Sequence, residues 1–279
     1  MSDYTLDELM CALMAREVQD GDWVNHGAMV PLAGAALMLA KALHAPNVDF
    51  FYLGTVFQAV TPAENDLAQL IASPTSAYHS SRALMSHYDI VSWTLRGKCD
   101  LQFLRPVQVD AHGSVNVSIV GSRSHPRYRF HGIAVADAMV LVGRPCIYVT
   151  EHDRHVFVKE LPFRTGAGHI DGDRWRQRLG ASGGGPASVI TPLCVLDFDT
   201  PDRRARVRSI HPGVSLEELR ARTGFELVVD GRITDSMPPT DEELRVLREV
   251  VDPGETRKLE FKELRDSVRQ RLIQGREAV

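Results

Sequence analysis

Apolar residues recur at helical spacing directly after a capping sequence near the start of the chain. Thr5 and Glu8 stand three residues apart, as in a capping box, and residues 6–18 place Leu, Met and Val at intervals of three and four. Pro31 then precedes a run, 32–43, that is apolar nearly all round, and proline suits the first turn of a helix. The pattern predicts an amphipathic first helix and a second helix that is buried on most sides.

Short β-rich runs alternate with the helical segments. Further helices are predicted at 84–95 and 134–142. Strands are predicted at 23–27, 48–53, 100–104, 115–120 and 146–150. This alternation of helix and strand is typical of an α/β fold with an open, mainly parallel sheet and flanking helices.

The last part of the chain changes character after two adjacent prolines, Pro238 and Pro239. Thr240 and Glu243 repeat the capping-box pattern, which predicts a helix that runs to about residue 251. Residues 256–279 carry mixed charge, with apolar residues at roughly helical spacing. We therefore predict one domain over 1–254 and a charged C-terminal extension over 255–279 that is helical or partly disordered.

Composition and charge narrow the classes of function. The 279 residues are 44% hydrophobic, and 36 acidic against 32 basic residues give a formal net charge of −4. A chain without a basic surplus is a poor candidate for general nucleic-acid binding. The four cysteines are scattered without a C-x-x-C pair, which argues against a disulfide framework or a thiolate zinc site. We expect no bound metal and no nucleic-acid partner.

The first residues and the hydropathy pattern bear on location. The start of the chain is acidic where a secretory signal is basic and then apolar. The longest apolar stretch, 28–43, is interrupted by Pro31 and Lys41 and falls short of a membrane span. We therefore expect a cytoplasmic protein with no membrane partner.

Three ordered groups of residues resemble family I CoA-transferase β subunits, in particular those of glutaconate CoA-transferases. The first is 30–47, where a proline-containing loop and a buried helix end in the turn His44-Ala-Pro-Asn47. The second is 97–104 followed by 108–116, which is similar to the family's Q-V-D-x-x-G-x-x-N block. The third group comprises 183–186, 189–191, 195–198, 211–213 and 223–226.

This resemblance implies a NagB/RpiA/CoA-transferase-like fold and an acyl-CoA thioester as substrate, with no separately bound cofactor. It also implies an α-type partner subunit, usually in an α2β2 assembly, with the active site where the two chains meet. The polypeptide is then half of an enzyme. The same family includes the β subunit of a steroid ring-opening hydrolase and a cofactor-free decarboxylase.

One departure from the family pattern concerns the nucleophile. Transferases of this type carry a glutamate just after the strand that follows the H-A-P-N turn, and its carboxylate attacks the thioester carbonyl. The corresponding stretch here, 50–56, reads Phe-Phe-Tyr-Leu-Gly-Thr-Val, so Tyr52 or Leu53 stands at the position of the glutamate. Asp49 and Glu64 are poor substitutes, because catalytic geometry tolerates only small displacements.

A second departure lies at 131–136, where the family commonly has a glycine-rich turn near the thioester. Only Gly132 remains, and the β-branched residues Ile133 and Val135 limit how closely the backbone can approach a ligand. The predicted residues of the substrate or CoA pocket are Leu53, Gly54, Thr55, Gln108 and Gly132. For Gln108 and its partner Asn116, an amide pair that stabilises a turn is an equally good interpretation.

Histidines near the predicted loops have simpler interpretations than catalysis. For His26 we prefer a hydrogen-bonded loop histidine over one that faces a pocket. His152 and His155 flank a charged turn, for which a solvated hairpin is the preferred interpretation.

The sequence therefore favours the β-type subunit of a heteromeric enzyme that acts on acyl-CoA thioesters by hydrolysis or C–C ring cleavage. The reason is a resemblance to the family without its covalent carboxylate. Two alternatives stay open: a genuine CoA-transferase whose nucleophile comes from elsewhere, and a non-catalytic assembly subunit.

Overall fold

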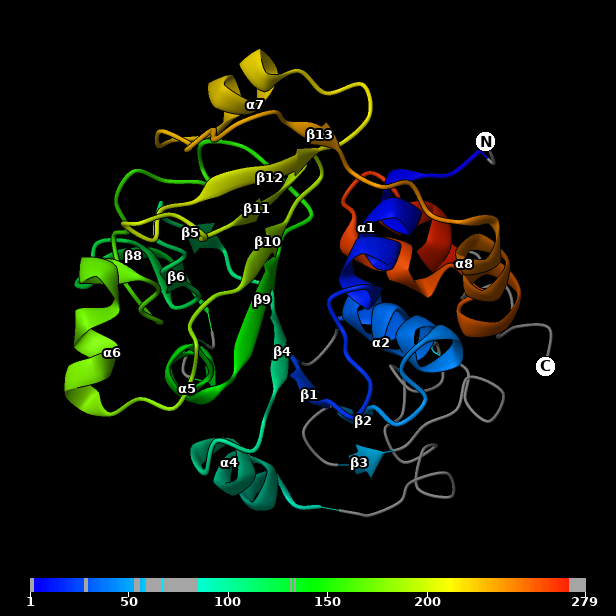
Figure 1. The fold of residues 1–279 in the computed structure, drawn as a ribbon, viewed down its shortest axis with the longest axis horizontal. Helices are drawn as coiled ribbons and strands as arrows, with labels where there is room; N and C mark the ends of the chain where they lie inside the picture. Colours follow the sequence, from blue (N-terminus) through cyan, green and yellow to red (C-terminus); the bar gives the residue numbers. More distant parts are fainter. Residues whose placement is uncertain are drawn as a thin grey trace. The chain divides into compact units, whose positions relative to one another are not determined.

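The computed structural model describes residues 3–27, 30–52, 56–58, 67, 85–130, 132 and 134–270 (Figure 1). The chain divides into two compact units. Unit 1 comprises residues 1–92 and 237–279, and unit 2 comprises residues 93–236. The predicted division into 1–254 and 255–279 stays a prediction.

Unit 1 contains the two helices predicted from the start of the sequence. Helix α1 (Leu6–Ala15) begins at the Thr5 capping box, in which the Thr5 backbone amide donates to Glu8 Oε2 at 2.9 Å. Helix α2 (Pro31–Leu43) has proline in its first turn and is buried from its first residue to Lys41. Figure 1 shows α1, α2 and α8 (Asp241–Val246) close together.

The remaining elements of unit 1 follow the predicted order. Strand β1 (Trp23–His26) is parallel to β2 (Asp49–Tyr52), and β2 is antiparallel to β3 (Val56–Gln58). Val24 stands opposite Phe50, and both side chains are fully buried. Helix α4 (His87–Leu95) lies at the boundary of the two units. A π-helix (Leu247–Val251) and a 3-10 helix (Thr256–Glu260) follow α8.

The described part of the predicted C-terminal extension packs onto the first two helices. The buried carboxylate of Glu260 accepts from the Leu32 amide at 2.7 Å, which satisfies an unpaired backbone donor in the first turn of α2. Arg257 is 1% exposed and forms ion pairs with Asp7 at 2.8 Å and Asp252 at 2.9 Å. The extension thus supplies charges that the N-terminal helices need.

Glu8 completes this charged cluster at the first turn of α1. Burial alone would raise the pKa of Glu8. Hydrogen bonds from Arg248 and from the Thr5 amide, with the positive charge of Arg257, outweigh burial and lower the pKa to about 2. The carboxylate is therefore ionised at neutral pH, so the cluster holds opposite charges in contact.

Unit 2 is built on a mixed sheet whose strands follow the order β13-β12-β11-β10-β9-β4. The pairs β4/β9, β9/β10 and β12/β13 are parallel, whereas β10/β11 and β11/β12 are antiparallel. The strands are β4 (Leu101–Leu104), β9 (Arg144–Tyr148), β10 (Ser188–Ile190), β11 (Cys194–Asp197), β12 (Arg206–Ile210) and β13 (Thr234–Asp235). Mainly parallel pairing with flanking helices confirms the predicted α/β class.

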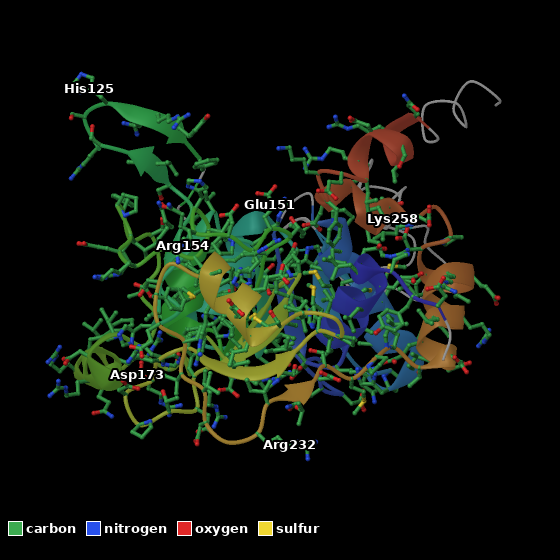
Figure 2. All side chains as sticks on the ribbon, turned by 90° about the horizontal axis from the view of Figure 1, so that it is seen from above. His125, Glu151, Arg154, Asp173, Arg232 and Lys258 are labelled. Atoms are coloured by element: carbon green, nitrogen blue, oxygen red, sulfur yellow. The ribbon has the colours of Figure 1, made fainter. Side chains whose placement is uncertain are left out.

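Two hairpins and several helices complete unit 2. One hairpin pairs β5 (Gln108–Val109) with β6 (Val115–Asn116), and the other pairs β7 (Ile119–Gly121) with β8 (Pro126–Arg129). In Figure 2 the second hairpin projects, with His125 at its tip. The helices are α5 (Ala134–Leu141), a 3-10 helix (Ile170–Asp173), α6 (Arg174–Leu179) and α7 (Leu216–Arg222). None of the described helices is long and apolar enough to cross a membrane.

The charged cluster makes a prediction about stability. Arg257→Gln leaves the buried carboxylates of Asp7 and Asp252 without their cation, so we expect the free energy of unfolding to fall by about 3–5 kcal/mol. The matched control Arg245→Gln removes ion pairs to Glu242 and Glu249 in which Arg245 is half exposed, so we expect a much smaller loss. Chemical denaturation measures the free energy of unfolding of both variants. Equal losses would contradict the role of Arg257 as the stabilising cation of Asp7 and Asp252.

Candidate functional site

The carboxyl ends of β1 and β2 meet at one edge of the sheet in unit 1. Asn25 stands opposite Phe51, so the next residues along, His26 and Tyr52, are the last of their strands and lie side by side in register. In open α/β sheets, ligands bind at the carboxyl ends of parallel strands. Of the two residues predicted to stand at the position of the missing glutamate, Tyr52 falls at this edge.

Part of the predicted site lies beyond what the structure describes. Leu53, Gly54 and Thr55 are outside the described residues, and for Tyr52 only the backbone is described. Their assignment to the substrate pocket stays a prediction.

His26 is a buried neutral imidazole at the end of β1. His26 is only 4% exposed, and its Nδ1 lies 2.8 Å from the carbonyl oxygen of Gly27. Burial, opposed in part by this hydrogen bond, lowers the pKa of His26 to about 4. Because Nδ1 donates to the carbonyl, Nε2 carries the lone pair. A histidine in this state brings no charge to the strand edge at neutral pH.

The predicted amide pair on the β5–β6 hairpin is in direct contact. Asn116 Nδ2 donates to Gln108 Oε1 at 2.9 Å and to the Ile119 carbonyl at 2.7 Å, while Asn116 Oδ1 accepts from the Ser118 amide at 3.0 Å. Gln108 Nε2 donates to the carbonyl of His155 at 3.2 Å. Both amides are buried and tie the hairpin to neighbouring loops, so the turn-stabilising interpretation holds for them. A role of Gln108 in a substrate pocket stays a prediction.

Gly132 packs directly against this hydrogen-bonded segment. A Cβ atom on Gly132 would lie 2.3 Å from Ser118 Oγ, and the backbone of Gly132 has a positive φ of 47°. Ser118 Oγ is in turn 2.8 Å from Thr165 Oγ1, which accepts from the Val117 amide at 3.0 Å. Only glycine fits this position without strain. Two predicted pocket residues therefore meet one polar network. Gln108 accepts a hydrogen bond from Asn116, and Gly132 packs against Ser118.

The sequence analysis did not identify the hydroxyl pair of this network. Ser118 and Thr165 are 47 residues apart in the chain and meet only in the fold. The run of small residues at 165–168 was the sequence signal that could have indicated close packing at this segment. In the structure, a Cβ atom on Gly168 would lie 2.1 Å from the His112 carbonyl oxygen. Two hydroxyls and a glycine backbone can hold an oxygen-bearing substrate group by hydrogen bonds.

His152 does not lie in the solvated hairpin predicted for it. The residue is 4% exposed; Nδ1 lies 2.9 Å from Thr191 Oγ1, Nε2 lies 3.0 Å from Thr223 Oγ1, and the ring stacks on Phe157. His155, by contrast, is exposed. Burial lowers the pKa of His152 to about 3, so its imidazole is neutral. The prediction missed this because both threonines lie far along the chain from His152.

A metal centre finds no support in the described part of the chain. There, no group of three His, Cys, Asp or Glu side chains is placed to hold an ion. The described site chemistry is therefore that of amides, hydroxyls, glycine backbone and a neutral imidazole.

Known proteins similar in sequence to this chain include subunits of a CoA-transferase and of a ring-cleaving hydrolase. The family model described as Coenzyme A transferase matches residues 8–222. A 3-oxoadipate CoA-transferase subunit of Pseudomonas knackmussii is 27% identical over 89% of this chain and 94% of its own length. The cholesterol ring-cleaving hydrolase IpdB subunit of Rhodococcus jostii is 32% identical over 54% of this chain and 58% of its own.

Solved structures agree with the sequence relatives. The decarboxylase AibA/AibB is 26% identical, covers 93% of this chain and 99% of its own, and gives a TM-score of 0.76. IpdAB of Rhodococcus jostii is 24% identical, covers 94% of this chain and 100% of its own, and gives a TM-score of 0.78. The second likeness shows a shared fold. The predicted NagB/RpiA/CoA-transferase-like fold is thereby confirmed.

The close contact at Gly132 makes a prediction. Gly132→Ala places a methyl group against Ser118 Oγ and forces alanine into a left-handed backbone conformation, so we expect a loss of about 2–3 kcal/mol in unfolding free energy. Gly213→Ala is the matched control, because Gly213 also has a positive φ, 87°, but has no atom within 4 Å of the added Cβ. Thermal unfolding compares them, and an equal loss would show that the Ser118 contact is not tight.

The buried His152 predicts how stability changes with pH. Because its pKa falls from the usual 6.5 to about 3 on folding, the unfolded chain binds the proton first and stability is lost as pH falls below 6.5. The loss at pH 5 is about 2 kcal/mol, from about 1.4 kcal/mol per pH unit. His152→Gln should lose less between pH 7 and pH 5 than the unsubstituted chain, whereas the exposed control His155→Gln should lose as much. Identical pH profiles for both variants would refute this.

Proposed function

Because this chain belongs to the coenzyme A transferase family, we propose that it is the β-type subunit of a heteromeric enzyme acting on acyl-CoA thioesters. We propose further that the reaction is hydrolysis or C–C ring cleavage and not CoA transfer. One feature of the sequence carries this choice: by the resemblance to the family's transferases, Tyr52 or Leu53 stands where they have their nucleophilic glutamate.

A reaction without an acyl-enzyme needs no carboxylate at that position. In hydrolytic ring cleavage, a base removes a proton from water and the oxygen adds to a ring carbonyl carbon. The adjacent C–C bond then breaks, and its electron pair passes to the carbon next to the thioester carbonyl, which takes up a proton. The enzyme must hold the thioester, position water and supply the base, but it forms no covalent bond to the substrate.

The described residues support a role in holding and positioning. His26 is neutral and lies at the strand edge, so it brings no charge that could attack a carbonyl as a carboxylate does. Gly132 brings backbone close to the Ser118 and Thr165 hydroxyls. We assign the general base to the α-type partner, since the described strand edge of this chain offers no carboxylate in the glutamate position.

The relatives support chemistry other than transfer on this scaffold. IpdB subunits are named as parts of a cholesterol ring-cleaving hydrolase, and AibA/AibB is named a decarboxylase. Both names AibA/AibB and IpdAB denote two different chains. We therefore propose an α-type partner for this chain, in an α2β2 assembly located in the cytoplasm, with the active site shared by the two subunits.

Genuine CoA transfer is the second candidate. It is favoured by the 3-oxoadipate CoA-transferase relative, which matches this chain over 89% of its length. Transfer would require a nucleophile from elsewhere, for example from the partner. A non-catalytic role in assembly is the third candidate, and mutation separates it from the other two.

The exchange of labelled CoA between acids tests the choice of reaction. The co-purified α and β chains are incubated with an acyl-CoA, a second free acid and radiolabelled CoA thioester. We expect substrate to be consumed without label appearing in the second thioester, because neither Tyr52 nor Leu53 has a carboxylate to form the anhydride. Rapid exchange would remove the hydrolase proposal in favour of transfer.

Thr55→Val and Gln108→Leu then separate a catalytic from a purely assembling subunit. Each is expected to lower turnover of the complex by about tenfold or more, since each removes a polar group from the proposed pocket. Gln177→Leu, at an exposed position of α6, is the matched control. Unchanged turnover in both pocket variants would favour the assembly role.

A further inference from the structure

Unit 2 contains a cavity that is lined by none of the residues given a role in the proposed reaction. It has a volume of about 1060 Å³ and is bordered by the β5–β6 turn, the loop after β9 and the segment after α7. The lining residues are 110–112, 154, 159–161, 164, 170, 204, 220 and 223–227. A volume of this size accommodates a small organic molecule.

Positive charge predominates around the cavity. Five cationic side chains line it against three carboxylates, which are Asp110, Glu160 and Glu226; the cations are Arg154, Lys159, Arg164, Arg204 and Arg220. Two of the cations have acidic neighbours: Arg164 lies 4.0 Å from Asp110, and Arg204 lies 3.6 Å from Glu226. Within the described residues, Lys159 and Arg220 make no ion pair, so their charge is available to a ligand.

Arg154 is held in place at the cavity wall. Its Nε donates to the carbonyl of Ala221 at 2.7 Å, which joins the loop after β9 to the end of α7. Arg154 is labelled in Figure 2. The remaining guanidinium nitrogens are left to donate elsewhere. A guanidinium fixed through one nitrogen is suited to bind a phosphate or carboxylate through the other two.

His112 supplies a polar atom without a partner. Its Nδ1 is buried and has no hydrogen-bond partner within the described part of the chain. The backbone of His112 is fixed, since its amide donates to Asp110 Oδ1 at 2.9 Å and its carbonyl accepts from the His169 amide at 2.7 Å. Buried polar atoms are nearly always hydrogen-bonded, and this unsatisfied one belongs to a residue that lines the cavity.

The other side of the cavity is apolar. Phe225 and Leu227 contribute to the packed core of unit 2, and Ile170 and Leu161 line the same space. The ring centroid of Phe225 lies 6.2 Å from that of the buried Phe157, and this contact restricts the position of the Phe225 ring. Cations on one wall and an aromatic and aliphatic surface on another match a molecule with an anionic group and an apolar or planar body.

We propose that this cavity binds an organic phosphate of nucleotide type. The phosphate oxygens accept from Arg154, Lys159 and Arg220, and the base or ring lies against Phe225. A phosphate is favoured over a carboxylate because more than one available cation borders the cavity, and a diphosphate presents enough oxygens to use them. Two sources share this chemistry: the nucleotide end of a CoA thioester, which rests on the proposed function, and a free nucleotide, which does not.

Binding of ADP to the full-length chain, alone and with its α-type partner, tests the proposal by isothermal titration calorimetry. We expect saturable ADP binding that weakens with added salt, weaker binding of pyrophosphate, and none of uncharged adenosine. Lys159→Gln combined with Arg220→Gln should weaken ADP binding by about tenfold or more, since two charged hydrogen bonds are lost. Both side chains are exposed, so the double variant is expected to fold.

Arg232→Gln is the matched control, because Arg232 is exposed in the same unit but does not line the cavity (Figure 2). Its affinity for ADP should equal that of the unsubstituted chain. Absence of saturable binding by ADP and pyrophosphate, or equal affinity in the double variant and in Arg232→Gln, would overturn the proposal.

Competition identifies the source of the phosphate. If an acyl-CoA displaces bound ADP, the cavity holds the nucleotide end of the thioester; if ADP binding persists with saturating acyl-CoA, it holds a free nucleotide. Both results support the site. Because the readout is binding and not turnover, failure of the proposed reaction would leave this test interpretable.

Discussion

The buried side-chain amide of Asn116 is the contact on which the described half of the candidate site depends. All of its hydrogen-bonding groups are used, by Gln108 on one strand and by Ser118 and Ile119 beyond the hairpin. Because an unpaired buried polar group costs free energy, these hydrogen bonds hold the backbone of Ser118 and Ile119 in place. Gly132 can then pack against Ser118.

Local patterns predicted much of the fold, because the elements are specified by neighbours in the sequence. The capping boxes at Thr5 and Thr240 and the proline at the start of α2 are found where expected. The π-helix after α8 continues the helix predicted to run to about residue 251. These signals act over three or four residues, which is the range at which sequence alone specifies structure.

Contacts between distant residues account for what the sequence did not predict. His152 is buried through its hydrogen bonds to Thr191 and Thr223. Arg257 is buried in an ion pair with Asp7, which lies 250 residues earlier in the chain. No spacing rule connects such pairs. For the site, the amide pair of Gln108 and Asn116 was identified as a pair, but the hydroxyls it leads to were not.

In the proposed function, holding a thioester and attacking it are separate tasks. The amide and hydroxyl network of unit 2 requires no charge, and His26 at the edge of β1 is neutral because of its burial. A carboxylate at the end of β2 would add the covalent step, and the sequence has aromatic and aliphatic residues there. Proteins similar to this chain are named as a CoA-transferase subunit, a ring-cleaving hydrolase subunit and a decarboxylase, so one fold serves more than one reaction.

Intact mass spectrometry of the β chain during turnover tests the absence of a covalent intermediate most directly. The complex is mixed with acyl-CoA, quenched with borohydride or hydroxylamine, and the mass of this chain is compared with that of the untreated chain. An unchanged mass is the predicted result. A stoichiometric adduct that maps to a carboxylate of this chain would contradict the account.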